Sequence, residues 1–460
     1  MNEVTKIDGI GSSVRRTEDK KFLTGKGRYT DDINRPGQVQ AYFLRSDVAH
    51  AEIKSIDTKA AQSAPGVVGV FTGSDIAADK VGGPICGWVV PCRDGSSTKE
   101  PPHPLLAQGK VRFVGDAVAV VVAETMEQAK SAAELIDVDY NELTPVVDFV
   151  NADKGAQIHE EVPNNCYFDW ELGDESATNK AIESAAKVVK LSVRNNRLVP
   201  NAMEPRSALA EYDSLDESYT LHTTSQNPHL TRLVLAAFMF AIPESKLRVI
   251  APDVGGGFGS KIYVYIEEAV CVWASKKIGR PVKWTADRTQ AFLTDCHGRD
   301  HVNDVQLALD DNNKIIGLRV DTVCNLGAYL SAFSVVVPTI LHGTLLSGQY
   351  DIPAIYTNVK GMATNTVNVD AYRGAGRPEA TYLLERTMET AAKEVGMDPA
   401  EFRRINFIPK DAFPYQTQVA LQYDIGDYDP HLDKAMEMID YSNFEKRRAE
   451  AAKRGMYRGI

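Results

Sequence analysis

The chain has no long hydrophobic run, no excess of positive charge and no paired cysteine motif. None of its apolar runs approaches the roughly 18 residues of a membrane-spanning helix, and its N-terminal stretch lacks the apolar core of a signal peptide. We therefore expect a cytoplasmic protein with no membrane span. Its 51 basic and 62 acidic residues give a formal net charge of −11 without a basic patch, which argues against nucleic acid as a partner.

Cysteine is also scarce. The six cysteines are spread thinly, without a CxxC pair or the spacing of an iron–sulfur or structural zinc site. Cys296, His297 and His301 form a local cluster, in which the two histidines would share a helix face. Gly298 between them and the lack of a clear fourth ligand argue against a metal site, so ordinary packing is preferred. We expect no side chain of this chain to ligate a metal directly.

Length and patterning indicate a large globular protein. The 460 residues suffice for two large domains or about three average ones. Residues 116–123 form a continuous apolar, β-branched run, residues 126–135 an alanine-rich helical stretch, and residues 136–140 another strand candidate. Residues 145–174 are polar and irregular, so we place a domain boundary near residue 150.

Strands and helices alternate after this boundary, and several helices have clear end signals. The helix that follows the glycine-rich loop is expected to stop at Gly279, and a second helix, over residues 379–395, at Gly396. A third is expected to begin at Asp398, with Glu401 placed for a capping box. The predicted fold class is therefore α+β, with mixed sheets and helices.

The most informative segment is APDVGGGFGSK, residues 251–261. It follows a short predicted strand at residues 247–250 and is expected to lead into a helix. Glycine has no Cβ and tolerates positive φ, so backbone amides of this loop can approach an anion or an oxo group near a helix start. The glycines concerned are Gly255, Gly256, Gly257 and Gly259.

The spacing of this loop excludes two familiar nucleotide-binding motifs. Ser260 stands where a Walker loop and a dinucleotide fingerprint both need glycine, and Ile262 replaces the Ser or Thr that follows a Walker lysine. Considered alone, the loop could also be only a tight turn.

Two further segments place polar groups beside predicted helices. AYRGAGRPE, residues 371–379, opens a helix and carries Arg373 and Arg377, whose planar guanidinium groups can donate to a phosphate or a metal-bound oxygen. TTSQNPH, residues 223–229, places Gln226 between a probable strand and a helix. On its own, such a glutamine is normally just a polar loop residue.

In combination, the order of TTSQNPH, GGGFGSK and AYRGAGRPE resembles the molybdenum-binding large subunit of the xanthine dehydrogenase/aldehyde oxidase family. The resemblance covers nearly the whole chain and includes RYTDDI and FVGDAVAVVVAET nearer the N-terminus. It implies an α/β hammerhead domain in residues 1–150 and the first molybdopterin-binding domain in residues 151–460. The family's second cofactor-binding domain is absent from this sequence, for which truncation or a split gene is the simplest account.

The resemblance also assigns roles to individual residues. In the family, the glutamine matching Gln226 contacts the molybdenum oxo ligand, and the arginine matching Arg373 lines the metal centre. Both are thus implied to be catalytic. The implied cofactor-binding residues are Gln226, Gly256, Gly257, Phe258, Gly259 and Arg373. The general base, a glutamate, is expected in the second domain, and we interpret Glu204 of NAMEPR as structural.

Departures from the family pattern narrow the substrate. Purine-oxidising members carry glutamate, arginine and phenylalanine at the positions of Ile262, Leu341 and Ala375, so this site has lost the polar partners of a purine. The chain looks like a carbon monoxide dehydrogenase large subunit in which Gly374 replaces the copper-binding cysteine, and glycine cannot ligate copper. An aldehyde or an aromatic N-heterocycle remains as the expected substrate, in an apolar pocket formed by Ile262, Leu341, Gly374 and Ala375.

The implied function is that of a molybdenum hydroxylase subunit that takes its oxygen from water. The implied cofactor is molybdopterin as a cytosine dinucleotide, with [2Fe–2S] and FAD carried by partner subunits in a dimer of heterotrimers. The isolated chain is expected to be inactive. Two alternatives stay open: a cofactor-free scaffold or assembly fragment of the same fold, and an unrelated anion-binding protein that uses the glycine loop.

Overall fold

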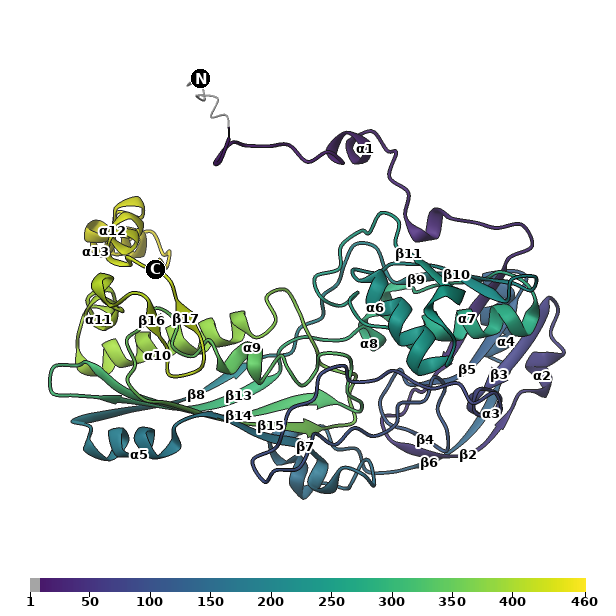
Figure 1. Cartoon of the computed structure of the whole chain (residues 1–460), viewed down its shortest axis with the longest axis horizontal. Helices are drawn as coiled ribbons and strands as arrows, with labels where there is room; N and C mark the ends of the chain where they lie inside the picture. Colours follow the sequence, from purple (N-terminus) through teal and green to yellow (C-terminus); the bar gives the residue numbers. More distant parts are fainter. Residues whose placement is uncertain (1–8) are drawn as a thin grey trace.

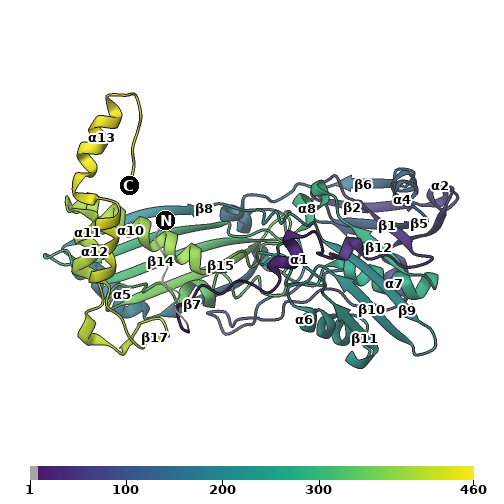
Figure 2. The ribbon, with the colours of Figure 1, turned by 90° about the horizontal axis from the view of Figure 1, so that it is seen from above.

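The computed structural model describes residues 9–460. It is an elongated α+β molecule with a seven-stranded sheet toward one end and a five-stranded sheet toward the other (Figures 1 and 2). The larger sheet has the order β11-β10-β9-β12-β1-β5-β3. Its strands are β1 (Val39–Arg45), β3 (Val67–Thr72), β5 (Ala117–Ala123), β9 (Ser207–Asp213), β10 (Ser218–Thr223), β11 (Leu247–Ile250) and β12 (Val282–Thr285).

This larger sheet draws strands from both sides of residue 150. β1 pairs in parallel with β12, in the register Val39 with Val282, and so joins strands from the first 150 residues to strands from much later in the chain. The two domains predicted from the sequence therefore share one sheet. Their boundary at residue 150 stays a prediction.

The five-stranded sheet has the order β7-β15-β14-β13-β8. Its strands are β7 (Cys166–Gly173), β8 (Lys187–Asn195), β13 (His301–Leu309), β14 (Ile315–Gly327) and β15 (Ile355–Ala363). The smaller sheets contain β2 (Ala51–Asp57), β4 (Lys110–Val111) and β6 (Asp137–Glu142), and β16 (Tyr415–Gln416) with β17 (Gln422–Tyr423).

Most helices pack against these sheets, α11 to α13 lie at the end that holds the C-terminus, and α1 lies apart in the N-terminal segment (Figures 1 and 2). The helices are α1 (Asp19–Leu23), α2 (Lys59–Gln62), α3 (Gly73–Ala78), α4 (Met126–Ala133), α5 (Glu175–Ser184), α6 (Pro228–Leu233), α7 (Ile266–Ile278), α8 (Arg288–Thr294), α9 (Ile340–Gly343), α10 (Arg377–Val395), α11 (Pro399–Asn406), α12 (Asp429–Met438) and α13 (Phe444–Ala452).

Most of the helix-end signals are confirmed. Gly279 ends α7 with φ +69° and Gly396 ends α10 with φ +69°, both in the left-handed conformation that glycine adopts easily. Asp398 caps α11 by accepting hydrogen bonds from two backbone amides of its first turn. The capping box expected at Glu401 is not formed, because that carboxylate lies 3.6 Å from Arg404 instead.

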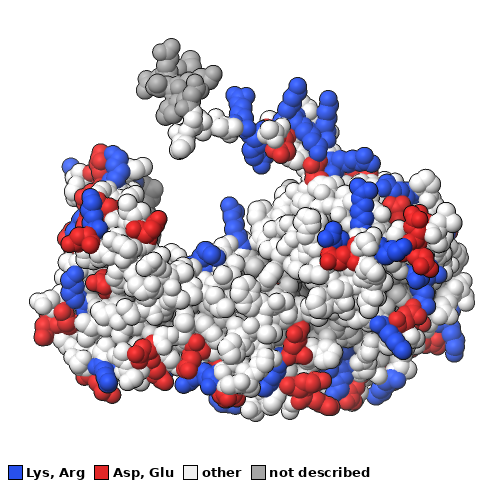
Figure 3. Space-filling view, viewed as in Figure 1, with Lys and Arg blue, Asp and Glu red and all other residues white. Residues whose placement is uncertain are grey.

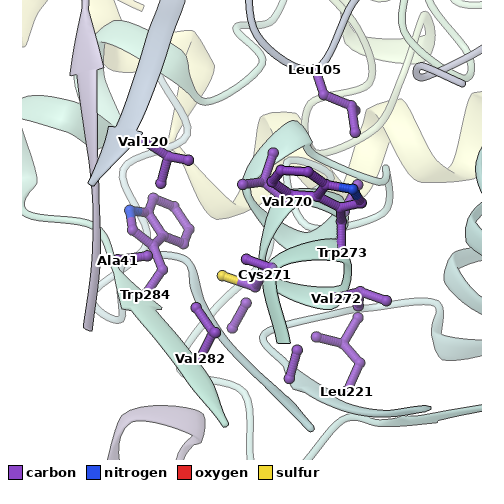
Figure 4. Close-up of a cluster of buried hydrophobic side chains, with 14 of the residues drawn as sticks. Ala41, Leu105, Val120, Leu221, Val270, Cys271, Val272, Trp273, Val282 and Trp284 are labelled. Carbon is purple, nitrogen blue, oxygen red and sulfur yellow. The ribbon is translucent and has the colours of Figure 1, made fainter. Parts of the chain in front are cut away.

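The core of the larger sheet lies beneath α7, which is buried along most of its length. Figure 4 shows Cys271 of α7 beside Trp284 and Val282 of β12, with Ala41 of β1 nearby. Trp284 is 1% exposed and meets Phe43 edge to face, with 5.9 Å between ring centroids. This packing fixes the segment that leads out of the glycine loop.

Two adjacent glutamates in the first turn of α7 are buried, with opposite pKa shifts. Burial alone would raise the pKa of Glu267, but the charges of Arg206 and Arg45, each at 2.7 Å, lower it to about 2. Burial raises the pKa of Glu268 to about 7, although it accepts hydrogen bonds from Thr223 and from the Tyr265 amide.

Replacing Glu268 by glutamine is expected to remove one component of the pH dependence of stability. An unfolded glutamate loses its proton near pH 4.5, whereas folded Glu268 keeps it to about pH 7, so the native state binds more protons between these values. Its contribution to stability is therefore lost as the pH rises through this window. Denaturant titrations should show the wild-type free energy of unfolding falling relative to Glu268→Gln from pH 4.5 to 7. Parallel curves would contradict the assignment.

Candidate functional site

Three loops predicted from the sequence lie together in the structure. β10 and β11 run in parallel, with His222 opposite Ile250, so the loops that follow them leave the same edge of the sheet. The Oε1 atom of Gln226, after β10, accepts hydrogen bonds from the amides of Gly259 (3.0 Å) and Lys261 (3.3 Å) in the glycine loop after β11. The folding of the two loops is thus coupled.

The arginine loop, residues 371–376, joins them from the start of α10. The Arg373 amide donates to the Phe258 carbonyl at 2.7 Å, and the Arg373 guanidinium lies over the Phe258 ring, 5.6 Å from its centroid. Gln226, Phe258 and Arg373 are all exposed, and Phe258 keeps 41% of its surface. The structure therefore places these three predicted residues side by side on an open face.

Close approach explains the glycines of this loop. A Cβ on Gly257 would lie 2.3 Å from Gln226 Oε1, and one on Gly259 would lie 2.3 Å from the Ala371 carbonyl oxygen. Gly256 and Gly259 also have positive φ, and Phe258 between them adopts φ +53°, a strained value for a residue with a Cβ. Such strain at an exposed loop is typical of a ligand site.

The helix predicted after the glycine loop is present as α7, but the loop does not form its N-terminus. Residues 258–262 form successive turns, with Ser260 donating to Gly257 and Ile262 to Gly259, and α7 begins only at Ile266. The amides of Gly259 and Lys261 are therefore oriented by Gln226, and the Phe258 carbonyl by the arginine loop, not by a helix N-terminus.

Glu204 and Lys261 fasten the glycine loop at both ends. The Glu204 carboxylate accepts from the Gly255 amide at 2.7 Å and from Lys261 Nζ at 3.0 Å. Lys261 is 2% exposed, and burial lowers its pKa, against the opposing effect of Glu204. These contacts, both made by Oε2, agree with a structural interpretation of Glu204.

Sequence reasoning missed a buried support behind the arginine loop. The Asp370 carboxylate accepts from the Phe333 amide at 2.8 Å and from the Ser331 hydroxyl, and burial raises its pKa to about 6. Tyr263 donates to the Ala371 carbonyl at 2.9 Å. The position of Asp370 directly before the loop was visible in the sequence, but a single aspartate there is not distinctive.

Three of the four predicted pocket residues share one apolar cluster. Ile262, Leu341 and Ala375 pack against a common set of side chains, namely Tyr263, Tyr265, Cys296, Ala332, Val337 and Ala371. Gly374 instead lies exposed beside this cluster with φ +110°. A Cβ there would lie 2.4 Å from Pro378 Cγ, so a cysteine at this position would require the loop to shift.

The expected helix-face arrangement of His297 and His301 is wrong. His301 begins β13 and His297 forms a bridge with Val369, so the two residues lie on extended backbone. Burial lowers the pKa of each imidazole to about 4, which keeps both rings neutral at pH 7. Within residues 9–460, no group of three or more His, Cys, Asp or Glu side chains is arranged to hold a metal ion.

The donors of the site suit an oxygen-rich, anionic cofactor. Gln226 Oε1 accepts hydrogen bonds from both loop amides, so the NH2 group of the same side chain is left to donate to a ligand. No hydrogen bond within residues 9–460 uses this NH2 group. The Arg373 guanidinium contacts the Phe258 ring and makes no ion pair with the described residues. An amide and a guanidinium are therefore available to an anionic ligand on this exposed face.

Comparisons with known proteins agree with this geometry. A family model for the molybdopterin cofactor-binding domain matches residues 158–407, and the a/b hammerhead domain of aldehyde oxidase and xanthine dehydrogenase matches residues 24–144. The carbon monoxide dehydrogenase large chain of Hydrogenophaga pseudoflava is 36% identical, over 97% of this chain and 56% of that protein. The crystal structure of quinoline 2-oxidoreductase from Pseudomonas putida 86 superposes with a TM-score of 0.90 and 34% identity, over 97% of this chain and 56% of that one.

This chain thus spans little more than half the length of those two relatives. The large molybdopterin subunit of nicotinate dehydrogenase from Eubacterium barkeri is 27% identical, over 95% of this chain and 98% of that subunit. No helix among the described residues is long and apolar enough to cross a membrane. The two family matches together cover both parts of the described fold. The chain therefore belongs to the xanthine dehydrogenase/aldehyde oxidase family of molybdopterin-binding large subunits.

Proposed function

We propose that this chain forms one wall of a molybdopterin site in a molybdenum hydroxylase that oxidises an aldehyde or an aromatic N-heterocycle. The observation that carries the proposal is the convergence of Gln226, the glycine loop and Arg373 on one open face. The bound molybdenum centre would supply the two-electron oxidation that inserts a water-derived oxygen into a C–H bond of the substrate.

Residues of this chain would hold and orient the cofactor. The Gln226 NH2 group would donate to an oxygen of the cofactor, and the backbone of Gly256, Gly257, Phe258 and Gly259 would lie against it. Arg373 provides a planar cation beside the same position. Lys261 and Glu204 keep the loop in place before any ligand arrives, so little ordering is left for binding to impose.

The proposed substrate class follows from the apolar cluster. Ile262, Leu341 and Ala375 offer no hydrogen-bonding side chain, so they favour a flat apolar ring or an aldehyde over a purine. Two of the relatives named above act, by their names, on quinoline and nicotinate, which are aromatic N-heterocycles. Carbon monoxide is disfavoured, because Gly374 cannot ligate copper.

The proposal requires other protein parts. Glu204, the carboxylate that contacts Gly255, is engaged by Lys261, so we propose that the general base comes from a second cofactor-binding domain like that of the longer relatives. The upper face of the molecule is hollowed between the end formed by α12 and α13 and the N-terminal segment, and this hollow carries few charged side chains (Figure 3). The lack of charge supports the proposal that the second domain covers this face. We further propose a cytosine dinucleotide form of the cofactor, and iron–sulfur and FAD subunits that accept the electrons in a dimer of heterotrimers.

Co-expression tests this function. The chain is produced with a polypeptide carrying the second domain and with the two electron-transfer subunits, and molybdenum per chain is measured by elemental analysis. Dye reduction is then followed with quinoline, benzaldehyde, xanthine and carbon monoxide as probes. We expect near-stoichiometric molybdenum and turnover of quinoline or benzaldehyde only.

Other outcomes would redirect the assignment. A stable complex without molybdenum would indicate the cofactor-free scaffold, and tight binding of ordinary nucleotides without molybdenum would indicate an unrelated anion-binding protein. Turnover by the isolated chain would contradict the need for an external base. Rapid xanthine oxidation would contradict the substrate class.

A further inference from the structure

The segment that leads into β13 is pressed against the arginine loop. A Cβ on Gly298 would lie 2.3 Å from Tyr372 Cβ, so only glycine allows this approach. Arg299 and Asp300 follow with φ +68° and +70°, although neither is glycine. Two consecutive left-handed residues cost conformational free energy and persist only where surrounding contacts hold them. Such a backbone, buried beside a candidate site, points to a functional constraint.

The Arg299 side chain holds the arginine loop through several contacts, and we call this set of contacts the clamp. Its guanidinium donates to the Tyr372 carbonyl at 2.9 Å and to the Arg373 carbonyl at 3.0 Å. It also pairs with Glu379, in the first turn of α10, at 2.9 Å, and lies 4.9 Å from the centroid of the Tyr372 ring. One planar group thereby fastens the beginning of the loop to the helix that follows it.

The clamp is itself anchored on its far side. The Asp300 carboxylate accepts from Arg197 Nε at 2.8 Å and from the Asn325 side chain at 3.0 Å, which ties the segment to β14. Arg299 and Glu379 are only 6% and 1% exposed, so neither can contact a ligand on the open face directly. Any effect of Arg299 on the site must therefore pass through the loop.

We propose that Arg299 is a positioning residue that sets the place of Arg373 in the site. The inference rests on the proposed function, because it assumes that Arg373 acts there. The Arg373 side chain is held within the described residues by the Phe258 ring, and its backbone by a hydrogen bond to the Phe258 carbonyl. The hydrogen bond from Arg299 to the Arg373 carbonyl is the third constraint. It is the only one of the three whose partner lies outside the glycine loop and the arginine loop.

A double-mutant cycle in the assembled holoenzyme separates positioning from general stability. Arg299→Lys keeps the charge opposite Glu379 but loses the planar fork, so kcat for quinoline is expected to fall at least about tenfold while KM changes little. In an Arg373→Ala background, the same substitution should lower kcat by less than about twofold, because residues that act as a unit are not additive. Additive losses would overturn the inference.

Hydrogen exchange gives a readout that does not depend on turnover. The amides of Arg373 and Ala375 are hydrogen-bonded in the loop, to Phe258 and Tyr372 respectively. We expect both to exchange faster in Arg299→Lys than in the wild-type chain, and unchanged exchange would also overturn the inference. Arg319→Lys is the matched control: this arginine likewise pairs with a carboxylate, Asp321, and covers a tyrosine ring, but it lies away from the loops. It should leave kcat and the loop amides unchanged.

A second variant covers the case in which Arg299→Lys does not fold. Gly298→Ala pushes Tyr372 aside while keeping the pair of Arg299 with Glu379, and it should show the same non-additivity with Arg373→Ala. If Arg373→Ala alone leaves turnover intact, the proposed role of Arg373 fails, and the inference fails with it. If Arg373→Ala is impaired but the clamp variants are additive to it, the clamp fails and the proposed function stands.

Discussion

Replacing Gly257 by alanine is expected to lower turnover of the assembled enzyme about 100-fold, the order of loss that a misplacement near 1 Å can cause. The new Cβ would lie 2.3 Å from Gln226 Oε1 and 2.4 Å from its Cδ, so the side-chain amide must leave its present place. Gly257 does not have a positive φ, so the substitution adds little backbone strain. The measurement is kcat with quinoline or benzaldehyde, together with molybdenum content and thermal unfolding of the same preparations.

The control for this prediction is an alanine substitution at a glycine whose added Cβ would contact no other atom. Gly95 has φ +81° and open space around its missing Cβ, so Gly95→Ala costs backbone strain but moves no side chain of the site. Its turnover and molybdenum content should equal those of the wild type, whereas Gly257→Ala should lose activity without unfolding. Full activity in Gly257→Ala would show that the Gln226 amide does not matter where the structure holds it.

Neutralising Glu267 as Glu267→Gln is expected to lower the free energy of unfolding by about 3–5 kcal/mol, because it breaks a buried ion pair on one side only. Glu267 is 1% exposed and balances two guanidinium groups, those of Arg45 and Arg206, at 2.7 Å each. Asp295, 2.6 Å from Arg206, would be left as the only carboxylate paired with these two cations among the described residues. Equilibrium denaturation at pH 7 measures the loss.

The matched substitution is Glu124→Gln, since Glu124 meets Arg280 with two short hydrogen bonds at the surface. That exposed pair should contribute far less than the buried one, because solvent screens it. The folded pKa of Glu267, about 2, lies below its ordinary 4.5, so its contribution is present above pH 4.5 and is lost as the pH falls toward 2. The gap between wild type and Glu267→Gln should therefore narrow in acid. A gap that stays constant down to pH 3 would contradict the ion-pair explanation.

Local signals made much of the fold predictable. The apolar run that became β5 and the glycines that end α7 and α10 act within a few residues of themselves, so the sequence displays them directly. The pairing of β1 with β12 was not predictable in this way. It depends on which of several apolar strands meet across the chain, and short-range patterns do not contain that information.

For the candidate site, too, local features were predictable from the sequence and long-range contacts were not. Residue chemistry identified the glycine loop, Gln226 and Arg373 as separate candidates, and only the family resemblance suggested that they would meet. Arg299 escaped notice because its role depends on a left-handed backbone at a residue other than glycine, which no sequence pattern indicates. The glycine loop misled in one respect: a strand followed by glycines suggested a helix start, whereas tertiary hydrogen bonds orient its amides.

The seam between β1 and β12 limits how this protein can be taken apart or recombined. Exchanging the first 150 residues with those of a relative would transplant three strands of a seven-stranded sheet and create a new junction at Val39 and Val282. A chimera must therefore match pleat, side-chain volume and hydrogen-bond register along that line, or it would leave two buried strand edges without partners. The five-stranded end offers no simpler junction, because β9 to β12 of the larger sheet lie between β8 and β13 along the chain.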